Sequence, residues 1–161
     1  MKTRFLFPNK FKIVGWILFM PSLICSVFFI LFENFKIKFL KIKVFAFYFD
    51  DFMNDRFSGF FKIIDNNITD ELLVFGLIIG GILTGFSKLK NEDEMISKIR
   101  YESLVWATYL NYGLIILFTI FFYGIGYYSI LIYNTFTLLL FFIIRFHYMI
   151  YKLNKANQDD E

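Results

Sequence analysis

Residues 103–124 read SLVWATYLNYGLIILFTIFFYG, and residues 127–144 read YYSILIYNTFTLLLFFII. Neither stretch contains a charged residue, and each approaches the ~20 residues that a helix needs to cross a hydrocarbon core of ~30 Å. Only Ile125 separates Gly124 from Gly126 between the two stretches. The sequence therefore predicts two transmembrane helices joined in a tight antiparallel hairpin that turns at Ile125.

Two further apolar stretches extend this hairpin to a predicted all-α bundle of four transmembrane helices in a single membrane domain. Residues 13–32 carry no charge and contain Pro21, which is expected to kink the helix. Residues 72–86 form a shorter apolar run. We expect this second helix to cross only if it covers residues 69–89, with Thr69 as its N-cap.

The composition of the 161-residue chain excludes several classes of protein. Hydrophobic residues make up 58% of the chain and charged residues 19%, whereas soluble domains carry ~25% charged residues. One cysteine, Cys25, leaves no internal disulfide. The basic residues punctuate the apolar runs instead of clustering, which argues against nucleic-acid binding. A soluble enzyme, a disordered chain and a disulfide-built domain are excluded, and the lipid bilayer is the expected surrounding.

The distribution of Lys and Arg predicts the orientation in the membrane. The N-terminal tail, the segment after residue 87 and the C-terminal part together carry more basic residues than residues 33–68. The positive-inside rule then places both termini in the bacterial cytoplasm and residues 33–68 outside. Between Phe35 and Phe49, Lys alternates with apolar residues with a slip at residues 39–40, which predicts a strand pair with a bulge.

A charged stalk is predicted where the hairpin helices continue past the membrane, at residues 91–102 and 145–153, before a polar tail at 154–161. Asn91 and Glu94 resemble a capping box that starts the third helix. The hairpin fold brings Glu102 near Arg145 and His147, so we expect a Glu102–Arg145 ion pair. The acidic residues expected to meet a partner are Glu92, Asp93 and Glu94.

Glycines and amides mark the remaining candidate positions. The second span carries Gly76, Gly80, Gly81 and Gly85, a spacing that lets another helix approach closely. Packing within the chain and a homodimer through this helix are both open interpretations. On the hairpin, the polar residues expected to make interhelical hydrogen bonds or to line a path are Asn111, Asn134 and Thr137, together with neighbouring Thr and Tyr.

No catalytic constellation, metal site or cofactor site emerges from the sequence. His147 is the only histidine, and Cys25 lies on a different span, so a Cys/His zinc site lacks its other ligands. The glycines lie in apolar helix or in the hairpin turn, so no phosphate-cradling loop is present. We therefore expect no enzymatic activity and no cofactor.

Four segments carry a resemblance to a known family. They read NNITDE at residues 66–71, EDEMISKIRYESLVWA at residues 92–107, and YNTF followed by FIIRF at residues 133–136 and 142–146. Together they resemble an uncharacterised family of small polytopic membrane proteins from Bacteroidota, over most of residues 66–152. The resemblance implies a setting in the inner membrane and supplies no activity.

Two functional hypotheses remain. The first is a non-enzymatic accessory, scaffold or signalling subunit whose stalk contacts a cytoplasmic protein. The second is a small dimeric transporter or channel with a polar path between the third and fourth helices. The first span contains no embedded carboxylate, which disfavours proton-coupled export.

Overall fold

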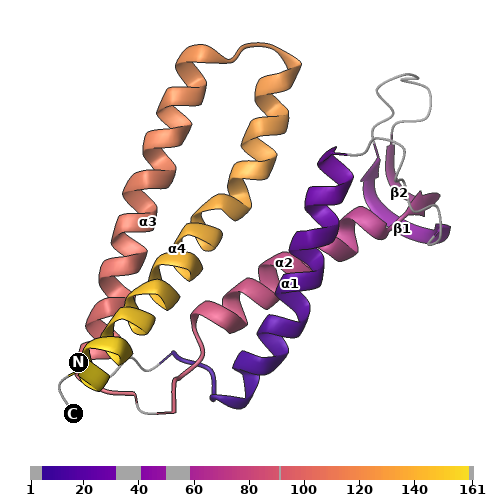
Figure 1. The fold of residues 1–161 in the computed structure, drawn as a ribbon. Coiled ribbons are helices and arrows are strands. Elements are labelled where there is room, and N and C mark those ends of the chain that lie inside the picture. Colours follow the sequence, from indigo (N-terminus) through magenta and orange to yellow (C-terminus); the bar gives the residue numbers. More distant parts are fainter. Residues whose placement is uncertain (1–4, 32–40, 50–58, 91, 160–161) are drawn as a thin grey trace. The chain divides into compact units, whose positions relative to one another are not determined.

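The computed structural model describes most of the chain, namely residues 5–31, 41–49, 59–90 and 92–159. The chain divides into two compact units, Met1–Pro21 with Gly76–Glu161 and Ser22–Phe75. In the described part, the first unit is helical apart from one β-bridge, and the second contains a two-stranded sheet (Figure 1).

Among the described residues, three helices are long and apolar enough to cross a membrane, over Lys10–Phe28, Glu94–Phe121 and Ile130–Ala156. Their outward faces are apolar: large exposed side chains include Ile13, Ile17, Ile116, Ile120 and Ile132. Such an exterior suits lipid better than water, because soluble monomers rarely expose extended apolar surface. The prediction of a helical protein with membrane-crossing segments is confirmed at this level.

Helices α3 (Glu94–Phe121) and α4 (Ile125–Asp159) lie side by side as an antiparallel hairpin (Figure 1). They contain 28 and 35 residues, so at ~1.5 Å per residue they are about 42 Å and 52 Å long. Both therefore exceed a hydrocarbon core of ~30 Å. The helices run unbroken through residues 94–102 and 145–153, as the stalk prediction requires.

The turn between these helices differs from the prediction. Phe122, Tyr123 and Gly124 connect them, and α4 already begins at Ile125, where the turn was expected. Gly124 has a φ of +75°, a left-handed conformation that a residue without Cβ adopts at no steric cost. The turn is therefore set by one glycine in a three-residue link.

Helix α1 (Lys10–Leu31) continues through Pro21, and within the first unit it meets α2 (Thr69–Gly85) backbone to backbone. A Cβ added at Gly80 would lie 2.6 Å from the Phe19 nitrogen, and one at Gly15 would lie 2.7 Å from the Thr84 nitrogen. Real Cβ atoms do not approach backbone atoms so closely. The two glycines therefore make this crossing possible.

Helix α2 ends at Gly85, so the predicted extension to Leu89 is wrong. Beyond the helix, the Phe7 N–H donates to the Phe86 carbonyl at 3.0 Å and the Lys88 N–H donates to the Phe7 carbonyl at 2.9 Å. These bonds draw the segment into a parallel β-bridge between Phe7 and Ser87. The 17 residues of α2 measure about 25 Å, and a fourth crossing stays a prediction.

The second unit contains an antiparallel pair of strands, β1 (Lys41–Phe49) and β2 (Gly59–Asn67), in which Val44 pairs with Ile64. The alternation of Lys with apolar residues thus correctly predicted β structure. Within the described residues it accounts for one strand, and the partner strand β2 was not identified. The bulge expected at residues 39–40 lies outside the described residues. After β2, Asn67 Oδ1 accepts a hydrogen bond from the Thr69 hydroxyl at 2.6 Å, where α2 begins.

Candidate functional site

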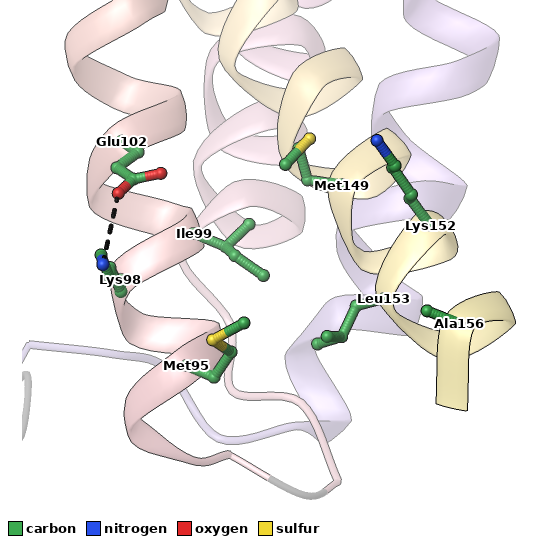
Figure 2. Close-up of a pocket in the computed structure, with 8 residues that line it drawn as sticks. All are labelled: Met95, Lys98, Ile99, Glu102, Met149, Lys152, Leu153 and Ala156. Atoms are coloured by element: carbon green, nitrogen blue, oxygen red, sulfur yellow. Dashed lines mark ion pairs between the residues drawn. The ribbon is translucent and has the colours of Figure 1, made fainter. Parts of the chain in front are cut away.

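An open groove of about 310 Å³ lies between α3 and α4, at the end of the hairpin opposite the turn. Figure 2 shows Met95, Ile99 and Leu153 pointing into the space between the two helices. Charged side chains border this apolar floor, and Lys98 Nζ lies 4.0 Å from Glu102 Oε1. We call this surface the stalk groove; its lining residues are Met95, Lys98, Ile99, Glu102, Met149, Lys152, Leu153 and Ala156.

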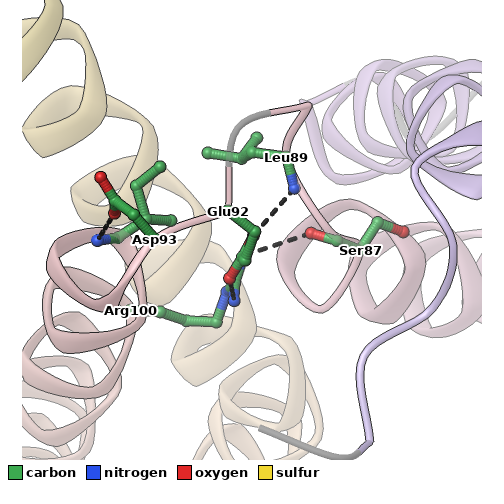
Figure 3. Close-up of polar contacts among 6 residues, drawn as sticks. Ser87, Leu89, Glu92, Asp93 and Arg100 are labelled. Atoms are coloured by element: carbon green, nitrogen blue, oxygen red, sulfur yellow. Dashed lines mark hydrogen bonds and ion pairs between the residues drawn. The ribbon is translucent and has the colours of Figure 1, made fainter. Parts of the chain in front are cut away.

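Arg100 forms a buried ion pair beside the stalk groove, on another face of α3 (Figure 3). Its guanidinium donates from Nη1 to Glu92 Oε1 at 2.5 Å and from Nη2 to Glu92 Oε2 at 3.2 Å. Nη2 also donates to the Ser87 carbonyl at 3.2 Å. The Phe146 ring of α4 lies 4.8 Å from the guanidinium carbon. One side chain therefore joins α3, α4 and the link that follows α2.

Sequence reasoning missed Arg100 as a site residue. Its partner Glu92 is eight positions away and lies outside the helix, so no helical spacing rule relates the two. Only 6% of the Arg100 side chain is exposed, although the residue falls within the predicted charged stalk at residues 91–102. One feature of the sequence could have indicated the pair: an acidic residue, Glu92, stands in the link just before the helix that carries Arg100.

Two of the acidic residues predicted to meet a partner, Glu92 and Asp93, make contacts within the chain. Besides the ion pair, Glu92 Oε2 accepts a hydrogen bond from the Leu89 N–H at 2.9 Å. Asp93 is the N-cap of α3, with Oδ1 accepting from the Ile96 N–H at 2.7 Å. Asp93 therefore replaces the predicted cap Asn91, which itself lies outside the described residues. Glu94 is exposed in the first turn of α3.

The predicted Glu102–Arg145 ion pair is not formed among the described residues. Glu102 is closest to the cation of Lys98, one turn earlier on its own helix. The guanidinium of Arg145 lies over the Trp106 ring, with its carbon 4.8 Å from the ring centre. Glu102 therefore has an i, i+4 neighbour of opposite charge, whereas Arg145 has an aromatic face but, in the described part of the chain, no hydrogen-bond acceptor for its Nη1.

His147 packs between α4 and α1. Its Nδ1 lies 2.9 Å from the Ile143 carbonyl oxygen, a contact within α4. Its ring meets Trp16 edge to face with the centres 5.2 Å apart, while Nε2 is buried without a hydrogen-bond partner. His147 therefore contributes to the packing of α4 against α1.

The two asparagines of the hairpin are buried, but within the described residues they do not make the interhelical hydrogen bonds that were expected. Asn111 and Asn134 are 5% and 7% exposed, and Asn111 Oδ1 and Asn134 Nδ2 have no hydrogen-bond partner. The Thr137 hydroxyl donates to the Tyr133 carbonyl within its own helix at 3.3 Å. A polar contact between α3 and α4 instead joins the hydroxyls of Thr119 and Tyr127, 2.8 Å apart.

The glycines of α2 pack within the chain. Gly80 faces the backbone of α1, while added Cβ atoms at Gly81 and Gly85 would strike Leu139 and Phe142 of α4. Gly76 is half-buried. These contacts favour the interpretation that the glycines allow packing within the chain. A homodimer through this face would have to displace α1 or α4.

Among the described residues, no group of three or more His, Cys, Asp or Glu side chains is arranged to hold a metal ion. Cys25 is a free thiol. No protein-family model, curated protein or solved structure matches the chain. The family resemblance therefore stays an expectation, and a functional proposal must come from the geometry.

Proposed function

We propose that this protein is a non-enzymatic membrane subunit whose stalk groove receives an amphipathic helix of a cytoplasmic partner. The observation that carries the proposal is the groove itself, with Met95, Ile99, Met149 and Leu153 open between two helices. Apolar surface left exposed to water is unfavourable, and it commonly marks a site of protein association. A helix laid into such a groove would bury it.

The distance between the groove and the hydrocarbon edge supports a partner that approaches from the water. From Ser103 onward α3 carries no charge, and α4 carries none before Arg145, so Glu102 and Arg145 mark the edge of the hydrocarbon. Met95 and Leu153 lie seven and eight residues beyond those edges, which is about 10–12 Å along an upright helix. The headgroup layer is ~5–8 Å thick on each side. The outer end of the groove would then face the cytoplasm.

The lining of the groove restricts the partner. Two methionines give its floor an adaptable apolar surface, which suits helices of varied shape. Lys152 has no ion pair within the described part of the chain, whereas Lys98 has Glu102 as its neighbour. The expected partner helix therefore has apolar residues at i, i+3 or i+4, and i+7 and an acidic residue facing Lys152.

This proposal includes an inner-membrane topology of four crossings with both termini in the cytoplasm. Its support is the excess of Lys and Arg in the N-terminal tail, the segment after α2 and the C-terminal part. The three long apolar helices fit this scheme, and α2 would provide the remaining crossing.

Photo-crosslinking tests the groove directly. A photoreactive phenylalanine at Met95 or Met149 in native membranes should give the same protein adduct from both positions. The adduct should map to a segment with the helical apolar spacing described above. The matched control is Ile116, an outward residue of α3 that is 62% exposed and should crosslink only lipid.

Two substitutions separate groove binding from incidental capture. Leu153→Asp places a charge on the floor and should abolish the adduct, and Lys152→Glu should weaken it severalfold by repelling the acidic residue. An adduct that survives Leu153→Asp, or that attaches outside an amphipathic helix, would refute the proposal. Charge reversal at Glu92 or Asp93 is unsuitable here, because both residues hold the fold.

A small transporter or channel is the second candidate. The observation in its favour is the pair of buried amide atoms without partners, on Asn111 and Asn134, since polar groups in a transmembrane bundle commonly mark a pathway. Ion or solute flux in liposomes that disappears in Asn134→Leu would support it. The control is Thr135→Val, whose hydroxyl donates within its own helix.

A further inference from the structure

We infer that a second pocket on the same hairpin, at Arg145, binds the phosphate of an anionic phospholipid. This inference goes beyond the proposed function and does not depend on it. The pocket has a volume of about 330 Å³ and is lined by Trp106 of α3 and by Phe141, Ile144, Arg145, Tyr148 and Met149 of α4. Its walls thus combine one cation, two aromatic residues with polar atoms, and three apolar side chains.

Arg145 is a cation without a counter-ion in the described part of the chain. The two ion pairs of the neighbouring stalk residues are Lys98 with Glu102 and Arg100 with Glu92. The guanidinium of Arg145 instead lies over the Trp106 ring, and its Nη1 is buried without an acceptor. Because a guanidinium stays charged at all physiological pH values, an anion from outside the chain is needed to neutralise it.

The position of Arg145 along α4 indicates which kind of anion would bind there. It is the first charged residue after the uncharged run of α4, so it lies where hydrocarbon gives way to headgroups. Phospholipid phosphates are concentrated at that depth, and Trp and Tyr side chains favour it. Phe141 and Ile144 lie on the hydrocarbon side of the pocket, where an acyl chain would pass. A phosphate on the guanidinium and a chain on these residues together describe a bound phospholipid.

An anionic headgroup is favoured over a zwitterionic one. A zwitterionic lipid brings its own cation to the site, whereas an anionic lipid neutralises Arg145 without adding one. One interfacial cation is expected to raise the affinity for an anionic lipid about fivefold.

Trp106 provides a probe inside the pocket. The chain has two tryptophans, so a Trp16→Phe background leaves Trp106 as the reporter. The protein in mixed micelles is titrated with brominated phosphatidylglycerol or with matched brominated phosphatidylcholine, and quenching of Trp106 is followed. Half-quenching should occur at an about fivefold lower mole fraction of the anionic lipid.

Variants decide whether Arg145 is responsible. Arg145→Gln should remove the preference for phosphatidylglycerol, Arg145→Lys should keep it because the charge remains, and the control Lys152→Gln should also keep it. An unchanged far-ultraviolet circular dichroism spectrum shows that each variant retains its helices. Equal quenching by both lipids in the parent protein, or a preference that survives Arg145→Gln, overturns the inference.

The same titration distinguishes binding of a lipid phosphate from binding of free inorganic phosphate. Sodium phosphate should not abolish the lipid preference beyond the effect of sodium sulfate at equal ionic strength. If phosphate competes selectively, the pocket takes a soluble anion and the inference of a lipid ligand is wrong.

Discussion

Arg100 illustrates how a charged residue can remain buried at the end of a membrane hairpin. Its two terminal nitrogens make three hydrogen bonds, two to Glu92 and one to the Ser87 carbonyl, and Phe146 covers its face. A buried pair contributes little net energy relative to an apolar replacement, but breaking one partner leaves an uncompensated charge. The pair therefore constrains how the link after α2 lies against α3.

Removal of one member of this pair should destabilise the protein in detergent. Loss of a partner in a fully buried pair costs roughly 3–5 kcal/mol, and we expect somewhat less here because 19% of the Glu92 side chain is exposed. Thermal unfolding followed by tryptophan fluorescence should show lower midpoints for Arg100→Gln and Glu92→Gln. The double variant should lose less than the sum of the single losses.

The exposed pair on the same helix is the matched control. Lys98 and Glu102 are 71% and 51% exposed, so Lys98→Gln should change stability by no more than about 0.5 kcal/mol. Equal effects of Lys98→Gln and Arg100→Gln would contradict the structural role assigned to Arg100.

Residue-level contacts were the least predictable part of this protein. The sequence identified Glu92, Asp93, Glu102 and Arg145 as noteworthy. It paired Glu102 with Arg145 incorrectly, and it did not predict the contacts that Glu92 and Asp93 make within the chain. Charge spacing along a helix does not reveal contacts between a loop carboxylate and a helical arginine, nor the preference of Arg145 for an aromatic face. Such contacts depend on the path of the link and on side-chain orientation.

At the scale of the helices, the crossing of α1 and α2 depends on Gly15 and Gly80, which have no side chain and let the two backbones approach closely. Helices in lipid gain little from the hydrophobic effect, so close backbone packing contributes much of their association. The sequence predicted the glycine face of α2, and it missed Gly15 because a lone glycine in an apolar span carries no spacing signal. The early end of α2 was also missed, because the bridge to Phe7 involves residues far apart in the chain.

Gly80→Ala should weaken this crossing. The added methyl would lie 2.6 Å and 2.9 Å from the nitrogen and Cα of Phe19, and backbone cannot move aside as a flexible side chain can. Overpacking of this kind costs typically ~1–3 kcal/mol, measurable as a lower unfolding midpoint. Gly113→Ala is the control: nothing lies within 4 Å of its Cβ position, so the change should be neutral or stabilising by up to ~1 kcal/mol.

The turn of the hairpin allows a separate test. Gly124 has a positive φ, so Gly124→Val should lower the unfolding midpoint by an amount corresponding to ~1–2 kcal/mol. Gly124→Asn should lose less, since Asn tolerates the left-handed region better than other residues do. Similar midpoints for Gly124→Val and the parent protein would contradict the assigned turn geometry.

At the scale of the whole molecule, the sequence predicted the helical membrane class because apolar length and charge-free runs are local properties. The number of crossings depends on α2, which is shorter than the three long helices. Local composition cannot decide whether a helix of this length spans the bilayer, since thinning of the lipid and flanking lysines both affect the outcome.

Cysteine labelling should resolve the topology. In a Cys25→Ser background, the expected result for four crossings is that Lys43→Cys reacts with an impermeant maleimide added outside. Lys88→Cys and Lys155→Cys should react only after the membrane is opened. Labelling of Lys43→Cys and Lys88→Cys from the same side would show that α2 does not cross.

The charge-free hairpin from Ser103 to Ile144 also bears on how the protein enters the bilayer. Each Lys, Arg or Asp at the centre of the membrane costs about 2.5–3.5 kcal/mol on the scale of translocon insertion, and this segment contains none. Its tip, with Phe122, Tyr123 and Gly124, exposes no ionic group to the hydrocarbon. The paired helices could therefore insert together in one step, without drawing on the membrane potential to carry charge across.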